Sequence, residues 1–124
     1  MKEIPIEYET SLSPHYSAAV VHDGLVYVSG QLAIDNASGK VVDGGVEEHT
    51  LQALRNLQRV LERSGTDISH VLQCRIYTSG VENWGKINQV YREFFGEHRP
   101  ARTIVPTREL HLGSLVEIEA TAYL

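Results

Sequence analysis

Two residues of opposite charge lie in short apolar segments near the end of the chain. Arg102 stands near the start of segment 100–106, and Glu117 stands in segment 115–120. A planar guanidinium can bind a carboxylate through two parallel hydrogen bonds, and a glutamate can hold and activate a water molecule. If the two strands are adjacent, the pair predicts a site for a small carboxylate and a water. The alternative is that both charges lie on solvated strand edges, with Arg102 in a surface salt bridge.

Four further positions could complete such a site. Ser29 and Gly30 end an apolar strand, where the glycine could let backbone approach a ligand and the serine hydroxyl could donate a hydrogen bond. A simple bend at the strand end explains the same pair. Tyr16 precedes an apolar strand and could either cap a pocket or anchor packing. Asn88 could serve an interface through its donors and acceptors, or lie on a helix surface.

Several kinds of site have little support in the sequence. The six histidines include no pair four residues apart and no neighbouring cysteine, so we expect no metal site. The single cysteine, Cys74, alternates with Leu72 and Ile76, which predicts a buried small apolar residue rather than a nucleophile. The chain has no phosphate-binding glycine loop, no dinucleotide fingerprint and no Gly-x-Ser-x-Gly turn.

Length and composition fit one soluble domain spanning residues 1–124. Of the 124 residues 42% are hydrophobic and 22% are charged, and the net charge is -5. An acidic chain is poorly suited to binding phosphate backbones, so we do not expect nucleic acid as its main partner. We expect a cytoplasmic protein, because no apolar run approaches the ~20 residues of a membrane span and the N-terminus has no apolar signal segment.

The elements that must position these residues can be placed along the chain. Asp23-Gly24 separates two apolar strands and predicts a hairpin. Residues 35–45 predict a loop, with a strand at 40–42. An apolar stripe predicts a helix from Val46 to the Ser64-Gly65 pair. Residues 71–78 alternate as a strand, a second helix runs from about Asn83 to Phe95 with Trp84, Ile87, Tyr91 and Phe94 buried, and a strand pair follows.

This order predicts an α+β fold in which both helices pack on one face of a mixed sheet. In the last strand, Val116 and the residues at every second position after it would face the helices, and Glu117 would face away. The other sheet face then carries apolar residues with no helix to cover them, among them Leu115, Tyr27 or Val26, and Ile104 or Val105. We therefore expect oligomerisation through the sheet.

The chain resembles the Rid/YjgF family of reactive intermediate (enamine/imine) deaminases over nearly its whole length. The segments that carry the resemblance are Tyr16-Ser17, Val28-Ser29-Gly30-Gln31-Leu32, Gly39-Lys40-Val41-Val42, Ala53-Leu54-Arg55-Asn56-Leu57, residues 87–95, Pro100-Ala101-Arg102-Thr103 and Val116-Glu117-Ile118-Glu119-Ala120. The resemblance implies a chorismate-mutase-like fold with a six-stranded mixed sheet, assembled as a homotrimer with sites at the subunit clefts.

The resemblance also implies roles for individual residues. Arg102 matches the arginine that binds the substrate carboxylate. Glu117, rather than Glu119 on the same strand face, matches the glutamate that positions the attacking water. Pocket residues are matched by Tyr16, Ser29, Gly30, Asn88 and Ile104. Ile104 stands where many members have a cysteine and would lend its backbone to the substrate. Pro14-His15 replaces the common Gly-Pro and could reshape the pocket mouth.

The implied reaction is the hydrolysis of 2-iminobutanoate or 2-iminopropanoate to a 2-keto acid and ammonia, without a cofactor. Pyridoxal-phosphate dehydratases would supply the enamines 2-aminocrotonate and 2-aminoacrylate, which tautomerise to these imines. One alternative is a trimer that binds small carboxylates without turnover and acts in regulation. A third interpretation, an RNA-directed translation inhibitor or ribonuclease, fits the acidic charge less well.

Overall fold

The computed structural model describes residues 1–7 and 14–124. The strands of its main sheet are β1 (Lys2–Ile4), β2 (Ala19–His22), β3 (Leu25–Leu32), β6 (Val71–Thr78), β7 (Ala101–Pro106) and β8 (Val116–Tyr123). A separate two-stranded sheet pairs β4 (Ile34–Asp35) with β5 (Lys40–Val41). The two helices are α1 (Val46–Arg63) and α2 (Trp84–Phe95).

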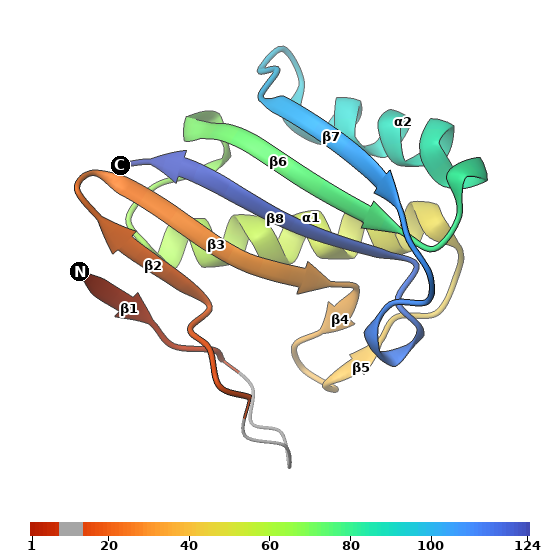
Figure 1. Ribbon diagram of the computed structural model, residues 1–124, viewed down its shortest axis with the longest axis horizontal. Coiled ribbons are helices and arrows are strands. Elements are labelled where there is room, and N and C mark those ends of the chain that lie inside the picture. The colour runs from red at the N-terminus through yellow and green to blue at the C-terminus, as the bar shows by residue number, and fades with distance from the viewer. Residues whose placement is uncertain (8–13) are drawn as a thin grey trace.

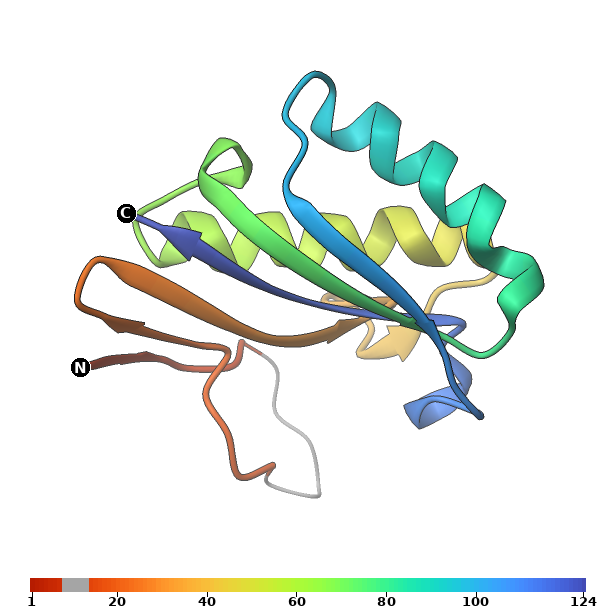
Figure 2. The same cartoon turned by 45° about the horizontal axis from the view of Figure 1, so that its top comes forward.

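The main sheet is mixed, and both helices cover the same face of it. Its strand order is β1-β2-β3-β8-β6-β7, with β6 and β7 parallel and the other neighbours antiparallel. Figure 1 shows α1 behind the middle of the sheet and α2 beside β7, and the turned view in Figure 2 keeps both helices on one side. The predicted architecture of six strands and two helices on one face is therefore confirmed.

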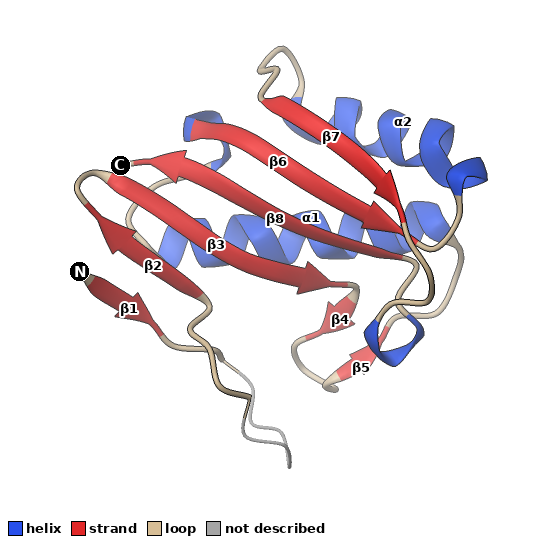
Figure 3. Cartoon of the chain, in the orientation of Figure 1, coloured by secondary structure: helices blue, strands red, loops and turns tan. Residues whose placement is uncertain are grey.

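The neighbours of the last strand differ from the expectation. The sequence predicts that β7 and β8 pair, but β6 lies between them. The physical reason is that α2 returns the chain to start β7 parallel to β6 at the sheet edge. Residues 107–115 then carry the chain past the end of β6, and β8 enters antiparallel between β3 and β6 (Figure 3). Strand β1, which no sequence pattern predicted, extends the opposite edge.

Local sequence explains the turn and the long helix. Asp23 and Gly24 have φ angles of 49° and 76°, the left-handed pair that a two-residue hairpin turn needs. At the end of α1, Gly65 has a φ of 92°, and the N–H groups of Gly65 and Thr66 donate to the carbonyls of Glu62 and Leu61. This pattern is the Schellman motif, which satisfies carbonyls that the helix end leaves unpaired.

The buried side of α2 is shifted from its predicted position. Ile87, Tyr91 and Phe95 are buried, whereas Trp84 is 47% exposed and Phe94 is only partly buried. Residues four apart lie on one stripe of a helix, so Phe95 continues the line of Ile87 and Tyr91 toward the core. Asn83 precedes the helix, but its side chain donates to the Thr78 hydroxyl at 3.0 Å instead of capping it.

The two faces of the sheet differ as the alternation in β8 predicted. Val116, Ile118, Ala120 and Ala122 are buried beneath the helices, while Glu117 and Glu119 lie on the helix-free face. Tyr27 is exposed, whereas Val26 belongs to the core. None of the helices among the described residues combines the length and apolar character needed to cross a membrane.

Candidate functional site

A bulge in β3 opens the sheet beside a cavity of about 630 Å³. The register between β3 and β8 shifts between Val28 and Gln31, so Ser29 and Gly30 form the irregular stretch. Bulges commonly re-aim side chains next to functional sites. Tyr16, Ser29, Gly30 and Glu117 all line this cavity, so the structure brings together four of the predicted site residues.

Gly30 lets the carboxyl group of Glu117 lie directly against the backbone. A Cβ atom at position 30 would be 2.8 Å from Oε2 and 2.9 Å from Cδ of Glu117. Those separations are too short for real atoms, so any other residue here would push the carboxyl group away. The sequence suggested that Gly30 could let backbone approach a ligand; the group that approaches it in this chain is Glu117.

The environment of Glu117 favours the protonated acid. Burial raises the pKa of Glu117, the neighbouring charge of Glu119 raises it further, and His111 opposes the shift. No donor in residues 1–7 or 14–124 hydrogen bonds to its carboxyl group. A half-buried carboxylate with a raised pKa and open acceptor sites can hold a water and accept a proton from it.

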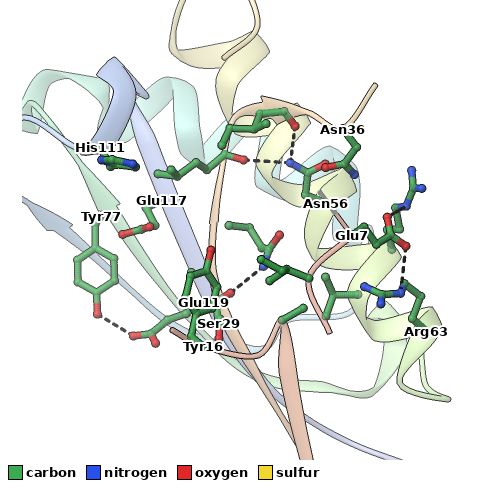
Figure 4. Close-up of a pocket in the computed structure, with 18 residues that line it drawn as sticks. Glu7, Tyr16, Ser29, Asn36, Asn56, Arg63, Tyr77, His111, Glu117 and Glu119 are labelled. Atoms are coloured by element: carbon green, nitrogen blue, oxygen red, sulfur yellow. Dashed lines mark hydrogen bonds and ion pairs between the residues drawn. The ribbon is translucent and has the colours of Figure 1, made fainter. Parts of the chain in front are cut away.

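Glu119 has a different environment, although it shares the strand face and the cavity. Its Oε1 accepts a hydrogen bond of 2.7 Å from the Tyr77 hydroxyl. That bond to a carboxylate raises the pKa of Tyr77. Figure 4 shows this pair beside Glu117 at one side of the cavity. Because Glu119 already accepts a strong bond, Glu117 is the better placed of the two to hold a water.

Tyr16 and Ser29 lie between the two ends of the cavity (Figure 4). The Ser29 hydroxyl donates to the carbonyl of Ser17 at 2.7 Å, so its hydrogen is directed at the backbone and its lone pairs remain as acceptors. Tyr16 is 47% exposed. The serine thus fixes the segment that carries Tyr16 onto the bulge in β3.

The far end of the cavity is basic, which the sequence analysis did not identify. Arg59 and Arg63 of α1 hold the Glu7 carboxylate, with Nε–O distances of 2.6 and 3.0 Å, and Arg63 also donates to the Pro5 carbonyl. The two arginines are four apart and therefore on one helix face, a signal that was present in the sequence. Their contacts attach the N-terminal segment to α1.

Arg102 lies elsewhere, under α2. Its Nη1 donates to Oδ1 of Asn88 at 3.0 Å, and its Cζ lies 5.4 Å from the ring centre of Trp84 and 4.7 Å from that of Tyr91. Ile104, two residues further along β7, packs against the hydrophobic core. The structure therefore brings Arg102 and Asn88 together, with Ile104 on the same strand, and none of the three lines the cavity.

Within one chain, Arg102 and Glu117 do not meet. Arg102 pairs in register with Cys74, which is fully buried on the helix-covered face, whereas Glu117 pairs with Tyr77 on the opposite face. Strand β6 also separates their strands. The expectation of two charges side by side in adjacent strands is therefore wrong for a single chain, because neither adjacency nor face can be read from spacing along the sequence.

Burial raises the pKa of the Cys74 thiol to about 11, in keeping with its predicted place in the core. Among the described residues, no three His, Cys, Asp or Glu side chains gather closely enough to hold a metal ion.

Comparison with known proteins gives one consistent family. The family model described as Endoribonuclease L-PSP matches residues 9–124. A 2-iminobutanoate/2-iminopropanoate deaminase of Rattus norvegicus is 39% identical over 107 residues, which cover 86% of this chain and 78% of the rat protein. RutC family protein PH0854 of Pyrococcus horikoshii is 36% identical over 108 residues, which cover 87% of this chain and 86% of that protein.

The fold agrees with solved structures of the same group. The crystal structure of YyfA from Yersinia pestis, described as a protein of unknown function of the conserved Rid family, matches with a TM-score of 0.89 at 32% identity. The match covers 99% of this chain and 100% of that one.

Proposed function

Because the chain belongs to the endoribonuclease L-PSP family, which includes the YjgF/Rid proteins, we propose that it is a 2-iminobutanoate/2-iminopropanoate deaminase. The observation that carries the proposal is the half-buried Glu117 carboxyl group in the cavity, whose pKa burial raises. The human and rat proteins named for this activity are 36% and 39% identical to this chain, respectively. A base with a raised pKa is suited to activating water near neutral pH.

The proposed site is assembled from two chains of a homotrimer. One chain contributes Glu117 with Tyr16, Ser29 and Gly30, and its neighbour contributes Arg102 with Asn88 and the backbone of Ile104. The opposite sheet faces on which Arg102 and Glu117 lie within one chain support this division. The helix-free face, which carries Tyr27 and other uncovered side chains, is the surface through which the chains would pack.

The reaction needs only water, a base and a carboxylate clamp. Arg102 holds the substrate carboxylate, and a water held by Glu117 attacks the imine carbon while Glu117 takes one of its protons. Glu117 gives that proton to the imine nitrogen, which completes a carbinolamine. Glu117 then takes the proton of the carbinolamine hydroxyl and passes it to the amino nitrogen as the C–N bond breaks, so ammonia leaves and the 2-keto acid remains. Orientation of the substrate and general acid–base catalysis, the latter contributing a rate factor of about 10²–10⁴, would accelerate a hydrolysis that proceeds slowly without the protein.

A coupled assay tests the proposal. A serine or threonine dehydratase generates the imine, and the release of 2-keto acid is followed with the wild-type protein, with Arg102→Ala and without protein. We expect faster release with the wild type alone. No acceleration, together with tight binding of 2-ketobutanoate, would instead support a carboxylate-binding regulatory trimer. Cleavage of a single-stranded RNA that survives in Glu117→Gln would support the nuclease named by the family model.

A further inference from the structure

Three side chains on successive turns of α2 surround the guanidinium of Arg102. Trp84, Asn88 and Tyr91 are spaced four and three residues apart, so they lie on one face of the helix. Asn88 supplies a hydrogen-bond acceptor at 3.0 Å, and the rings of Trp84 and Tyr91 lie 5.4 and 4.7 Å from Cζ. Both ring distances are within the range of favourable cation–π contacts.

All three partners are neutral, so they hold the guanidinium without cancelling its charge. Within the described part of the chain, no Asp or Glu forms an ion pair with Arg102. The buried hydroxyl of Tyr91 has no hydrogen-bond partner among the described residues, and it lies close to the Cys74 thiol. Burial raises the pKa of both groups, that of Cys74 to about 11, so neither supplies an anion near neutral pH.

The arrangement leaves most of the arginine available. A guanidinium has five N–H donors, and Asn88 takes one of them from Nη1. The aromatic contacts restrict the plane of the group without using a donor. A guanidinium whose plane is already fixed loses little conformational freedom when it binds a carboxylate, and its uncompensated charge attracts that carboxylate.

We propose that Trp84, Asn88 and Tyr91 are positioning residues that fix the Arg102 guanidinium for a carboxylate ligand. The inference rests on the proposed function for the identity of that ligand, a 2-imino or 2-keto acid. It assigns a role to Trp84 and Tyr91, which otherwise belong to the packing of α2. Trp84, at 47% exposed, is too open to be explained by core packing alone.

The binding test compares ring-removing and ring-keeping variants in the full-length protein. Trp84→Leu and Tyr91→Leu should weaken binding of 2-ketobutanoate by about 3- to 30-fold and raise KM by a similar factor, with kcat little changed. Trp84→Phe and Tyr91→Phe keep a ring face and should recover most of the affinity. Gln89→Leu, an exposed change on the same helix, is the matched control. Thermal unfolding identifies variants that fold poorly, and Trp84→Leu decides the test if Tyr91→Leu does not fold.

Trp84 is the only tryptophan of the chain, so tryptophan fluorescence tests its contact with Arg102 independently of catalysis. Arg102→Met should change the emission of the unliganded protein, whereas Arg92→Met on the exposed side of α2 should not. Addition of 2-ketobutanoate should change the emission only when Arg102 is present.

The outcomes separate this inference from the proposed function. If the wild type hydrolyses the imine but Trp84→Leu binds within twofold of the wild type, the positioning role is wrong and the function stands. Equal losses in Trp84→Phe and Trp84→Leu, or emission that Arg102→Met leaves unchanged, would also overturn it. If the wild type binds no 2-keto acid and has no turnover, the carboxylate ligand and the proposed function fall together.

Discussion

Glu117 occupies a position where three local features act on one carboxyl group. Gly30 allows it to lie against the backbone, burial withdraws it from water, and Glu119 places a second acid on the same strand face. Glu119 differs because Tyr77 donates to it. Two glutamates that strand alternation cannot distinguish therefore have unlike surroundings in the folded chain.

The first prediction separates these two glutamates. Glu117→Gln keeps the size of the side chain but removes the base, so turnover in the dehydratase-coupled assay should fall by about 10²-fold or more while 2-ketobutanoate still binds. Glu119→Gln should leave turnover within a few-fold of the wild type, because a glutamine oxygen can still accept from Tyr77. Normal turnover in Glu117→Gln would refute the water-activating role, and selective loss in Glu119→Gln would move that role two residues along β8.

A second prediction at Glu117 concerns stability and pH. Its folded-state pKa is raised, so folding favours the protonated acid, and this contribution to stability is lost as pH rises from the ordinary glutamate value through the raised one. Above that window the ionised carboxylate costs stability, and a neutral glutamine removes the cost. We expect Glu117→Gln to have the higher Tm at about pH 7, with the difference shrinking toward about pH 4. A lower Tm for the variant at neutral pH would contradict the sign.

At the scale of elements, α1 fixes the segments around the cavity through two buried polar side chains. The Asn56 amide donates to the carbonyls of Leu32 and Ile34, which holds the end of β3. His49 donates from Nε2 to the Val42 carbonyl and accepts from the Leu115 N–H through Nδ1, each at 3.0 Å. His49 is therefore neutral with its proton on Nε2, and it ties the start of β8 to the helix.

The third prediction follows from these two bonds. His49→Leu fills a similar volume but leaves the Leu115 N–H and the Val42 carbonyl without their partner, so the free energy of unfolding should fall by about 1–3 kcal/mol. Urea unfolding at one fixed protomer concentration measures the change. His22→Leu, an exposed change at the hairpin, is the control and should stay within about 0.5 kcal/mol of the wild type. Equal stability of His49→Leu and wild type would show that water replaces both bonds.

Elements with their own periodic signal could be predicted from the sequence, and their neighbours could not. The stripe from Val46 to Leu61, the Asp23-Gly24 turn and the alternation in β8 are local patterns, and each formed as predicted. The insertion of β8 beside β6 depends on pairing energies between distant segments, which no local pattern encodes. The burial of Phe95, where the pattern predicted Phe94, depends on which side of α2 meets the sheet.

For the candidate site as well, the residue types could be read from the sequence, but the contacts between distant elements could not. Residue types indicated a carboxylate clamp and a base, and the resemblance to a family selected Arg102 and Glu117. Spacing along the chain could not show that their side chains leave the sheet on opposite faces, since that depends on the register of each strand with β6. Nor could it show that Trp84 and Tyr91 lie beside Arg102, because that contact joins a helix to an edge strand.

At the scale of the whole molecule, the helix-free face predicts assembly. One face of the sheet is covered by α1 and α2, and the other leaves Tyr27 and Val105 exposed. We expect a homotrimer in sedimentation experiments at micromolar concentration, because uncovered sheet faces of this kind are interaction surfaces. Thr121→Arg, in the middle of this face, should weaken the assembly, whereas Glu62→Arg on the outer side of α1 should not. A stable wild-type monomer would refute both the interface and the shared site.

The last prediction tests whether each site takes Arg102 from one chain and Glu117 from another. Arg102→Ala and Glu117→Gln chains should each be inactive alone, yet a trimer formed from both contains some sites with an intact arginine and an intact glutamate. Random mixing in equal amounts should restore about a quarter of the wild-type activity, because each site draws its two residues independently from two chains. Arg102→Ala chains mixed with the double variant should recover none. If native mass spectrometry shows mixed trimers and activity stays absent, each site draws both residues from a single chain. The separation across β6 would then have to close by a rearrangement within that chain.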